Sequence, residues 1–143
     1  MSSDVVFSAV RTYLGETWSG LPVHYENETF IPPDPAATNA ATPPAWLEVI
    51  LEGDTYDQRS IGAGGGASER WAEEGAVIAT VFVPANVGSL YARQKLTALA
   101  DGFRGLTLSP NIRFQSMSVG DGAIGTEDGM WWALTLRAHW LRG

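Results

Sequence analysis

A nearly unbroken apolar run, GAVIATVFV at residues 75–83, constrains the fold of this chain more than any other feature. β-Branched residues dominate it, which favours a strand over a helix. Because the run lacks polar alternation, we expect a strand that is covered on both faces and lies in the middle of a sheet. Pro84 has no N–H group to donate to a neighbouring strand, so we expect the strand to end there.

Two amphipathic helices are expected, one before and one after this strand. The first begins at a Ser2 or Ser3 cap and ends near Gly15, and the second runs from Leu90 to about Gly102 after an N-cap hydroxyl from Ser89. Their apolar stripes recur three or four positions apart: Val5, Val6, Ala9, Val10, Tyr13 and Leu14 in the first helix, and Ala92, Leu96, Leu99 and Phe103 in the second. Each helix therefore has one face that must be covered by a sheet.

The other strands are predicted from alternation. Residues 21–25 form a short strand near an edge, where proline is tolerated, and residues 46–52 place Leu47, Val49 and Leu51 on one face. Residues 56–61 are a plausible strand, and the glycine-rich GAGGGASER that follows predicts a long, flexible hairpin reaching away from the body. Residues 27–44, rich in proline and alanine, predict a loop or extended arm.

Two strands are expected in the last part of the chain. The apolar phase shifts between Phe114 and Met117 within residues 112–119, which indicates a β-bulge, and residues 131–141 alternate cleanly. Successive strands without intervening helices favour antiparallel pairing. We therefore predict a single α+β domain over residues 1–143: a mostly antiparallel sheet with two helices packed on one face, a long hairpin and a Pro/Ala-rich arm.

Charge and composition exclude several classes of protein. The chain carries 16 acidic and 9 basic residues, a formal charge of −7, which argues against a surface that grips a phosphate backbone but suits DNA sliding past an acidic wall. The chain has no cysteine, which rules out disulfides and thiolate metal sites. Nothing approaches the about 20 apolar residues of a membrane helix, and no signal peptide is apparent. A soluble, intracellular protein is expected.

Candidate chemistry is sparse. The glycine run leads into a strand and lacks the Lys of a phosphate-binding loop, and His24 and His139 are isolated from other metal ligands. Glu73 and Glu74 are adjacent on a strand and point to opposite faces, so we interpret them as a charged flank that discourages unwanted pairing. No catalytic, cofactor-binding or metal site is predicted.

Large side chains outside the predicted core are the remaining unusual feature: Trp18, Trp46, Trp71 and Trp131. Trp, Tyr and Arg anchor protein interfaces, so these residues and the arm indicate contacts with another subunit. The alternative is that several of the tryptophans simply cover the core.

The order and spacing of several short motifs resemble a known family. They are VHYENETFIPP (residues 23–33), AWLEVILEG (45–53), RSIG (59–62), ERWAEEGAVIATVFVP (69–84) and NVGSLYARQKLTALADGF (86–103). Together they resemble the tail-terminator, or tail-completion, proteins of long-tailed phages and of phage-derived gene transfer particles.

That resemblance implies a non-enzymatic virion subunit, assembled in the host cytoplasm, which forms a homo-oligomeric ring of six copies, a hexamer. The ring caps the head-proximal end of the tail tube, ends tube polymerisation and docks to the head–tail connector, while DNA passes through the lumen without specific binding. Cofactors and membranes play no part. Candidate interface residues are Phe30, Trp46, Tyr56, Arg59, Ile61, Arg70 and Trp71. Two alternatives stay open: another neck or tail-tube subunit of the same particle, and a small ligand-binding domain or enzyme.

Overall fold

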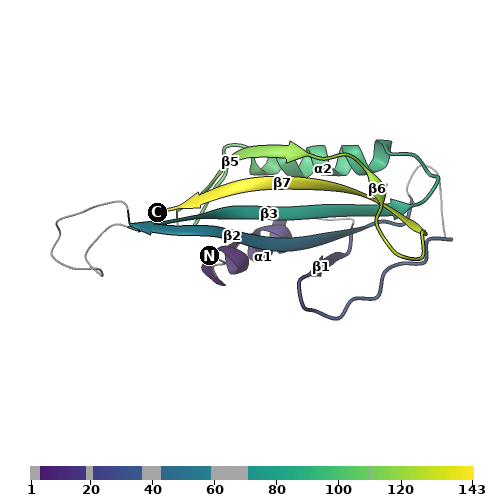
Figure 1. Cartoon of the computed structure of the whole chain (residues 1–143), viewed down its shortest axis with the longest axis horizontal. Helices are drawn as coiled ribbons and strands as arrows, with labels where there is room; N and C mark the ends of the chain where they lie inside the picture. Colours follow the sequence, from purple (N-terminus) through teal and green to yellow (C-terminus); the bar gives the residue numbers. More distant parts are fainter. Residues whose placement is uncertain (1–3, 19–20, 37–42, 59–70, 110) are drawn as a thin grey trace.

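A computed structural model describes residues 4–18, 21–36, 43–58, 71–109 and 111–143 of the chain. Two helices lie on one face of a single sheet, and the longest strands extend to one end of the molecule (Figure 1). The elements are α1 (Asp4–Thr17), β1 (Val23–Tyr25), β2 (Trp46–Gln58), β3 (Trp71–Pro84), α2 (Leu90–Phe103), β4 (Thr107–Leu108), β5 (Ile112–Val119), β6 (Ala123–Ile124) and β7 (Trp131–Arg142).

The strands lie in the order β1-β2-β3-β7-β5-β4, and β6 pairs with the free part of β7. β2 and β3 form a long antiparallel hairpin whose register runs from Trp46 opposite Phe82 to Gln58 opposite Trp71, with a shift between Gly53 and Thr55. Among the described strands, the pairing of β1 with β2 alone is parallel. The predicted α+β class, the mostly antiparallel sheet and the long hairpin are confirmed.

The core lies between the sheet and the two helices. Alternate residues of β2, β3 and β7 point toward the helices, as their sequence alternation predicts. Phe103 of α2 stacks on Phe114 of β5 with ring centroids 4.3 Å apart, and Trp140 of β7 is fully buried. At roughly 1.5 to 3 kcal/mol for each large buried side chain, this layer supplies most of the hydrophobic stabilisation.

The expectation that β3 is covered on both faces is wrong over the middle of the strand. Val77, Ala79 and Val81 are buried beneath the helices, whereas Ile78 and Thr80 on the other face are only half-buried. On that face the buried residues lie toward the two ends of the strand, Ala72 and Ala76 at one end and Phe82 at the other. The apolar run therefore marks a central strand without a second covering layer.

Helix ends differ from the predicted ones. α1 continues past Gly15 to Thr17, whose hydroxyl donates a hydrogen bond of 2.7 Å to the carbonyl of Tyr13. Ser89 precedes α2, but its backbone is already helical and its hydroxyl makes no capping bond. Its Oγ instead accepts a 3.3 Å hydrogen bond from Nε of Arg93, so the predicted hydroxyl cap is wrong.

Two short strands, β4 and β6, lie in segments where the sequence predicts no strand. β4 lies between α2 and β5 and pairs with Ile112 and Arg113, while β6 lies in the loop before β7 and pairs with Trp132 and Ala133. β6 occupies the part of β7 that β5 does not reach, because β5 pairs only with residues 136–142 of β7. Two-residue strands carry too little alternation to be recognised in a sequence. The predicted bulge between Phe114 and Met117 is confirmed.

β1 lies at an edge of the sheet, as expected, but runs parallel to β2. A parallel pair cannot be joined by a tight turn, since the chain must travel back to the level at which the first strand began. The arm between Tyr25 and Trp46 makes that return. Its described parts, residues 26–36 and 43–45, contain neither helix nor strand, which agrees with the prediction of an irregular connection.

Candidate assembly interface

The sheet face opposite the helices, here called the helix-free face, mixes aliphatic and polar side chains. It is formed by Glu48, Ile50 and Glu52 of β2, Ile78 and Thr80 of β3, and Thr135, Arg137 and His139 of β7. Ile50 is 38 % exposed, which is unusual for a large aliphatic residue in the interior of a sheet. No helix packs on this face among the residues that the structure describes.

Polar side chains on the helix-free face are bonded across strands. Arg137 donates two hydrogen bonds to the carboxylate of Glu52, 2.7 and 3.0 Å long, and so reaches across β3. The hydroxyls of Thr80 and Thr135 lie 3.0 Å apart and share a further hydrogen bond. These contacts hold the polar groups in fixed positions while leaving them in contact with solvent, as expected of a surface rather than of a second core.

An aromatic cluster covers one end of the helix-free face. It consists of Trp46, Phe82 and Trp131, with Phe30 and Ala133 packed against them. The rings of Trp46 and Phe82 stack with centroids 4.0 Å apart, and Phe30 approaches Trp46 at 5.1 Å. Trp46 is only 7 % exposed. In the single chain it therefore covers the core, which was the alternative to an exposed interface tryptophan.

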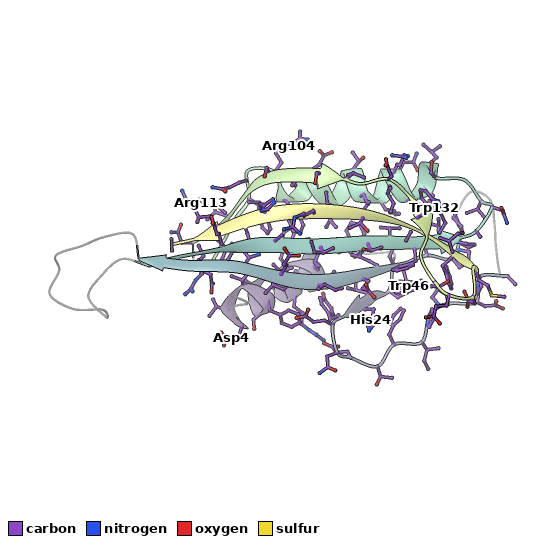
Figure 2. The ribbon with its side chains drawn as sticks, viewed as in Figure 1. Asp4, His24, Trp46, Arg104, Arg113 and Trp132 are labelled. Atoms are coloured by element: carbon purple, nitrogen blue, oxygen red, sulfur yellow. The ribbon has the colours of Figure 1, made fainter. Side chains whose placement is uncertain are left out.

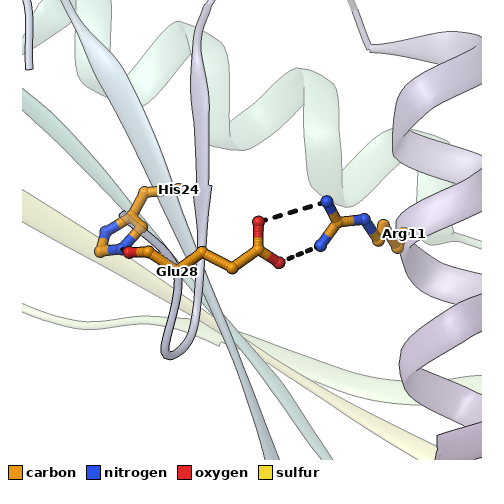
Figure 3. A network of polar contacts seen from close by, with 3 residues as sticks. All are labelled: Arg11, His24 and Glu28. Carbon is orange, nitrogen blue, oxygen red and sulfur yellow. Dashed lines mark hydrogen bonds and ion pairs between the residues drawn. The ribbon is translucent and has the colours of Figure 1, made fainter. Parts of the chain in front are cut away.

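The beginning of the arm is tied to α1 and β2 by several contacts. Glu28 forms an ion pair with Arg11 of α1, and its carbonyl lies 2.9 Å from Nε2 of His24 (Figure 3). The His24 ring stacks on Phe30, and a Glu26 carboxylate oxygen accepts a 3.3 Å hydrogen bond from the backbone N–H of Leu51. The arm therefore starts from a fixed point, which places Phe30 on the aromatic cluster.

Two ionisable groups at this fixed point have perturbed pKa values. The hydrogen bond from Arg11 holds the pKa of Glu28 below its usual range, with a smaller contribution from the opposite charge. Burial raises the pKa of Tyr25, whose ring lies 4.3 Å from the Arg11 guanidinium. These shifts report a structural ion pair and a buried phenol.

The predicted interface residues fall at two separate places. Phe30 and Trp46 lie in contact at the aromatic cluster. Tyr56 and Trp71 belong to the far end of the hairpin, where Tyr56 is opposite Glu73 and Trp71 is opposite Gln58. Arg59, Ile61 and Arg70 lie outside the described residues. The structure thus joins two members of the set and places two others at the opposite end of β2 and β3.

Glu73 corrects one prediction. It is 3 % exposed, lies in phase with the buried Val77, and has Oε1 3.6 Å from a guanidinium nitrogen of Arg142. It is therefore a buried partner of β7 and not a charged flank. The sequence does not predict this pairing, because Glu73 and Arg142 are 69 positions apart. The burial of Glu73 could have been predicted, because it has the same strand phase as Val77.

Metal ligands do not cluster in the part of the chain that the structure describes. Within these ranges, no three His, Cys, Asp or Glu side chains gather where they could hold a metal ion, and Nδ1 of His24 lies 3.6 Å from a Glu48 carboxylate oxygen. The two described helices are each too short to cross a membrane.

Comparison with known proteins gives the family. The model of the phage tail terminator protein family matches residues 5–140. The chain belongs to the phage tail terminator family. Membership gives it a structural role in a phage tail, in contact with other tail proteins, and confirms the resemblance of the motifs in residues 23–103.

Structural comparison finds the same fold in a solved protein. One solved structure aligns over 98 % of this chain and 94 % of its own length, with a TM-score of 0.65 and 21 % sequence identity, so the two share a fold. A search of curated proteins finds no match.

Proposed function

We propose that copies of this tail terminator close into a ring at the head-proximal end of the tail tube. The ring ends tube polymerisation and offers a docking surface to the head–tail connector, and DNA passes through its lumen. The family match over residues 5–140 carries this proposal, because it spans the sheet, both helices and the hairpin. In this proposal the whole described domain, and not one local site, takes part in assembly.

The β2–β3 hairpin supports a role in assembly. β7 pairs with β3 only as far as Glu73, whereas the hairpin continues to the pair formed by Gln58 and Trp71. The pairs beyond Glu73 form a two-stranded ribbon, which gains little stability from its own chain. We assign Tyr56, Trp71 and the adjoining Arg59, Ile61 and Arg70 to contacts with a neighbouring subunit.

The aromatic cluster supplies a second contact in this proposal. Phe30 is half-buried against Trp46, and the residue that follows it, Ile31, is 87 % exposed. An exposed aliphatic residue beside a rigid aromatic base is a suitable anchor for a partner. The assembled ring needs no cofactor and performs no bond chemistry.

Purification of the chain tests the ring directly. We expect size-exclusion chromatography with light scattering, and negative-stain microscopy, to reveal closed rings and not monomers or open tubes. Particles that lack the protein should carry tails of irregular length. Open tubes would assign the chain to the tube itself, and a monomer that persists at high concentration while turning over a small molecule would overturn the structural role.

Deleting residues 63–67 tests the hairpin assignment. A shortened tip should reduce ring formation and tail capping while the folded body retains its thermal unfolding temperature. The control is Gly15→Ala in α1, away from the hairpin, where an added Cβ meets nothing within 4 Å. Unchanged rings in the deletion variant would remove the hairpin from the interface.

A further inference from the structure

We propose that neighbouring copies in the ring join edge to edge, with residues 114–119 of β5 in one copy pairing with residues 53–58 of β2 in the next. This inference rests on the proposed ring and names how its subunits meet. Each edge strand has backbone groups that a further strand can bond, and strand addition at such an edge is a common form of recognition. The occupant of each edge is a second copy of this chain.

Both edges of the sheet are only partly covered. At one edge β1 pairs with residues 47–49 of β2, and at the other β4 pairs with residues 112 and 113 of β5. Across the described part of the chain, no strand pairs with the outer side of residues 53–58 or 114–119. The two open stretches have equal length, so the backbone N–H and C=O groups of one can bond those of the other along the whole stretch.

Strand direction favours the match. β2, β3, β7 and β5 are successive neighbours, and each pair is antiparallel, so β2 and β5 of one copy run in opposite directions. In a ring, all copies share one orientation along the axis. Placing β5 of one copy beside β2 of the next therefore creates another antiparallel pair, and the same contact repeats until the ring closes.

The offset between the two stretches also fits a closed sheet. Thr55 is opposite Glu74 of β3, which in turn is opposite Leu141 of β7. Ser118 is opposite Arg137 of β7. Thr55 and Ser118 are therefore displaced from each other by 141 − 137 = 4 residues along β7. Four residues span roughly 13 Å along a strand, and four strands span roughly 19 Å across the sheet. The resulting strand tilt of roughly 35° is within the range that closed barrels use.

Charge opposes the alternative pairing of two identical β2 edges. Residues 53–58, GDTYDQ, contain two carboxylates and no cation, while residues 114–119, FQSMSV, are uncharged. Arg113, labelled in Figure 2, directly precedes the open stretch of β5 and is exposed. An acidic edge repels a second copy of itself, which favours its contact with the uncharged edge of β5.

Edge pairing also determines which surface faces the lumen. Closing a sheet encloses one of its faces, and the helices must then lie outside, where there is room for a second layer. The helix-free face becomes the wall of the lumen, with Glu48, Glu52 and the Thr80–Thr135 pair exposed to what passes through. Such a polar, mixed-charge wall offers no cluster of Lys or Arg to hold DNA.

Cysteine cross-linking tests the pairing, because the chain has no native cysteine. We would combine Thr55→Cys with Ser118→Cys, two register positions on the same sheet face. Within one copy they lie three strand spacings apart, roughly 14 Å across the sheet, and are further displaced along it, so they are too far apart for a disulfide. Mild oxidation of the assembled protein should yield a ladder of covalent multimers on a non-reducing gel, and reductant should remove it.

The matched control combines Thr55→Cys with Met117→Cys. Met117 precedes Ser118 on the strand and so occupies the opposite face, which prevents a disulfide even when the strands are paired. We expect about tenfold less cross-linked product from this control than from the 55/118 pair. Rings that form in both variants without a difference in cross-linking would overturn edge pairing while leaving the proposed function intact; absence of rings in the unmodified chain would overturn both.

A second variant tests the same edge without oxidation. Gln115 and Ser116 fall in the gap of the β5–β7 register, so Ser116→Pro removes no pairing with β7. Proline at an open edge blocks strand addition, and we expect the ring fraction to fall about tenfold while the monomer keeps its circular dichroism spectrum. Ser116→Ala is the control and should assemble normally. Full assembly of a folded Ser116→Pro protein would overturn the inference.

Discussion

The two faces of the sheet use the same central strands, β2, β3 and β7, but differ in what holds their side chains. On the helix-covered face, aliphatic and aromatic residues interlock with α1 and α2. On the helix-free face, Ile50 and Ile78 lie among groups bonded across strands, such as Glu52 with Arg137. The helix-covered face stabilises the fold through burial of apolar side chains. The helix-free face holds hydrogen-bonded polar side chains in fixed positions at a surface that solvent or a partner can reach.

The difference teaches that hydrophobicity alone does not identify a core face. Ile78 is as apolar as Val77, yet only Val77 is buried. Burial of a sheet residue depends on whether a second layer covers its face. Both described helices pack on the same face of the sheet, the face of Val77. The following four predictions test this contrast, beginning with the largest expected effect.

Trp140→Ala should lower the free energy of unfolding by about 3–5 kcal/mol, because a fully buried indole leaves a cavity beneath the helices. Its neighbour His139 lies on the helix-free face, and His139→Ala should cost less than about 1 kcal/mol. Urea denaturation of both variants measures the difference. Equal losses would mean that the two faces are equally packed.

Gly75→Ala should destabilise the protein by about 1–3 kcal/mol, since the added methyl group cannot be accommodated without a backbone shift. A Cβ at this position would lie 2.2 Å from the carbonyl oxygen of Glu52 and 2.7 Å from the Trp140 ring. Thermal unfolding is the measurement. A variant as stable as the parent would show that β2 and β3 can separate at the bulge without cost.

The Glu52–Arg137 pair on the helix-free face should have a coupling energy of only about 0.2–1 kcal/mol, because both side chains are partly exposed and screened by water. A double-mutant cycle with Glu52→Gln and Arg137→Gln measures it. The coupling should shrink at high salt. A value several times larger would indicate that this face is shielded even in the single chain.

Glu28→Gln should reduce stability at neutral pH but not in acid. The hydrogen bond from Arg11 lowers the pKa of Glu28 in the folded state, so its contribution is present above the usual glutamate pKa and is lost as the pH falls through the lowered value. The unfolding temperatures of parent and variant should therefore differ at pH 7 and converge as the pH falls below the lowered pKa of Glu28. Arg11→Gln removes the same pair and should show the same profile.

Much of the fold could be predicted because the signals are local. The alternation of Leu47, Val49 and Leu51 gave the face that the helices cover, and the apolar stripes gave both helices to within a few residues. The phase shift after Phe114 located a bulge. Each of these depends on neighbours in the sequence, whose spacing the backbone geometry fixes.

What could not be predicted depends on residues far apart in the chain. The pairing of β3 with β7 and the parallel direction of β1 have no local signature. Burial of Trp46 follows from its stacking on Phe82, 36 positions later, and the site prediction therefore grouped residues that lie at opposite ends of the hairpin. Family resemblance supplied the role in the tail, which no single residue indicates.

The central position of β7 has a consequence for synthesis of the protein. β3 and β5 both pair with β7, and β7 follows both of them along the chain. Until Trp131–Arg142 has been synthesised, the nascent chain holds the β2–β3 hairpin, β5 and both described helices without the strand that joins β3 to β5. A premature stop codon anywhere before this segment would therefore yield a product that cannot close its interior, and quality-control proteases should degrade it.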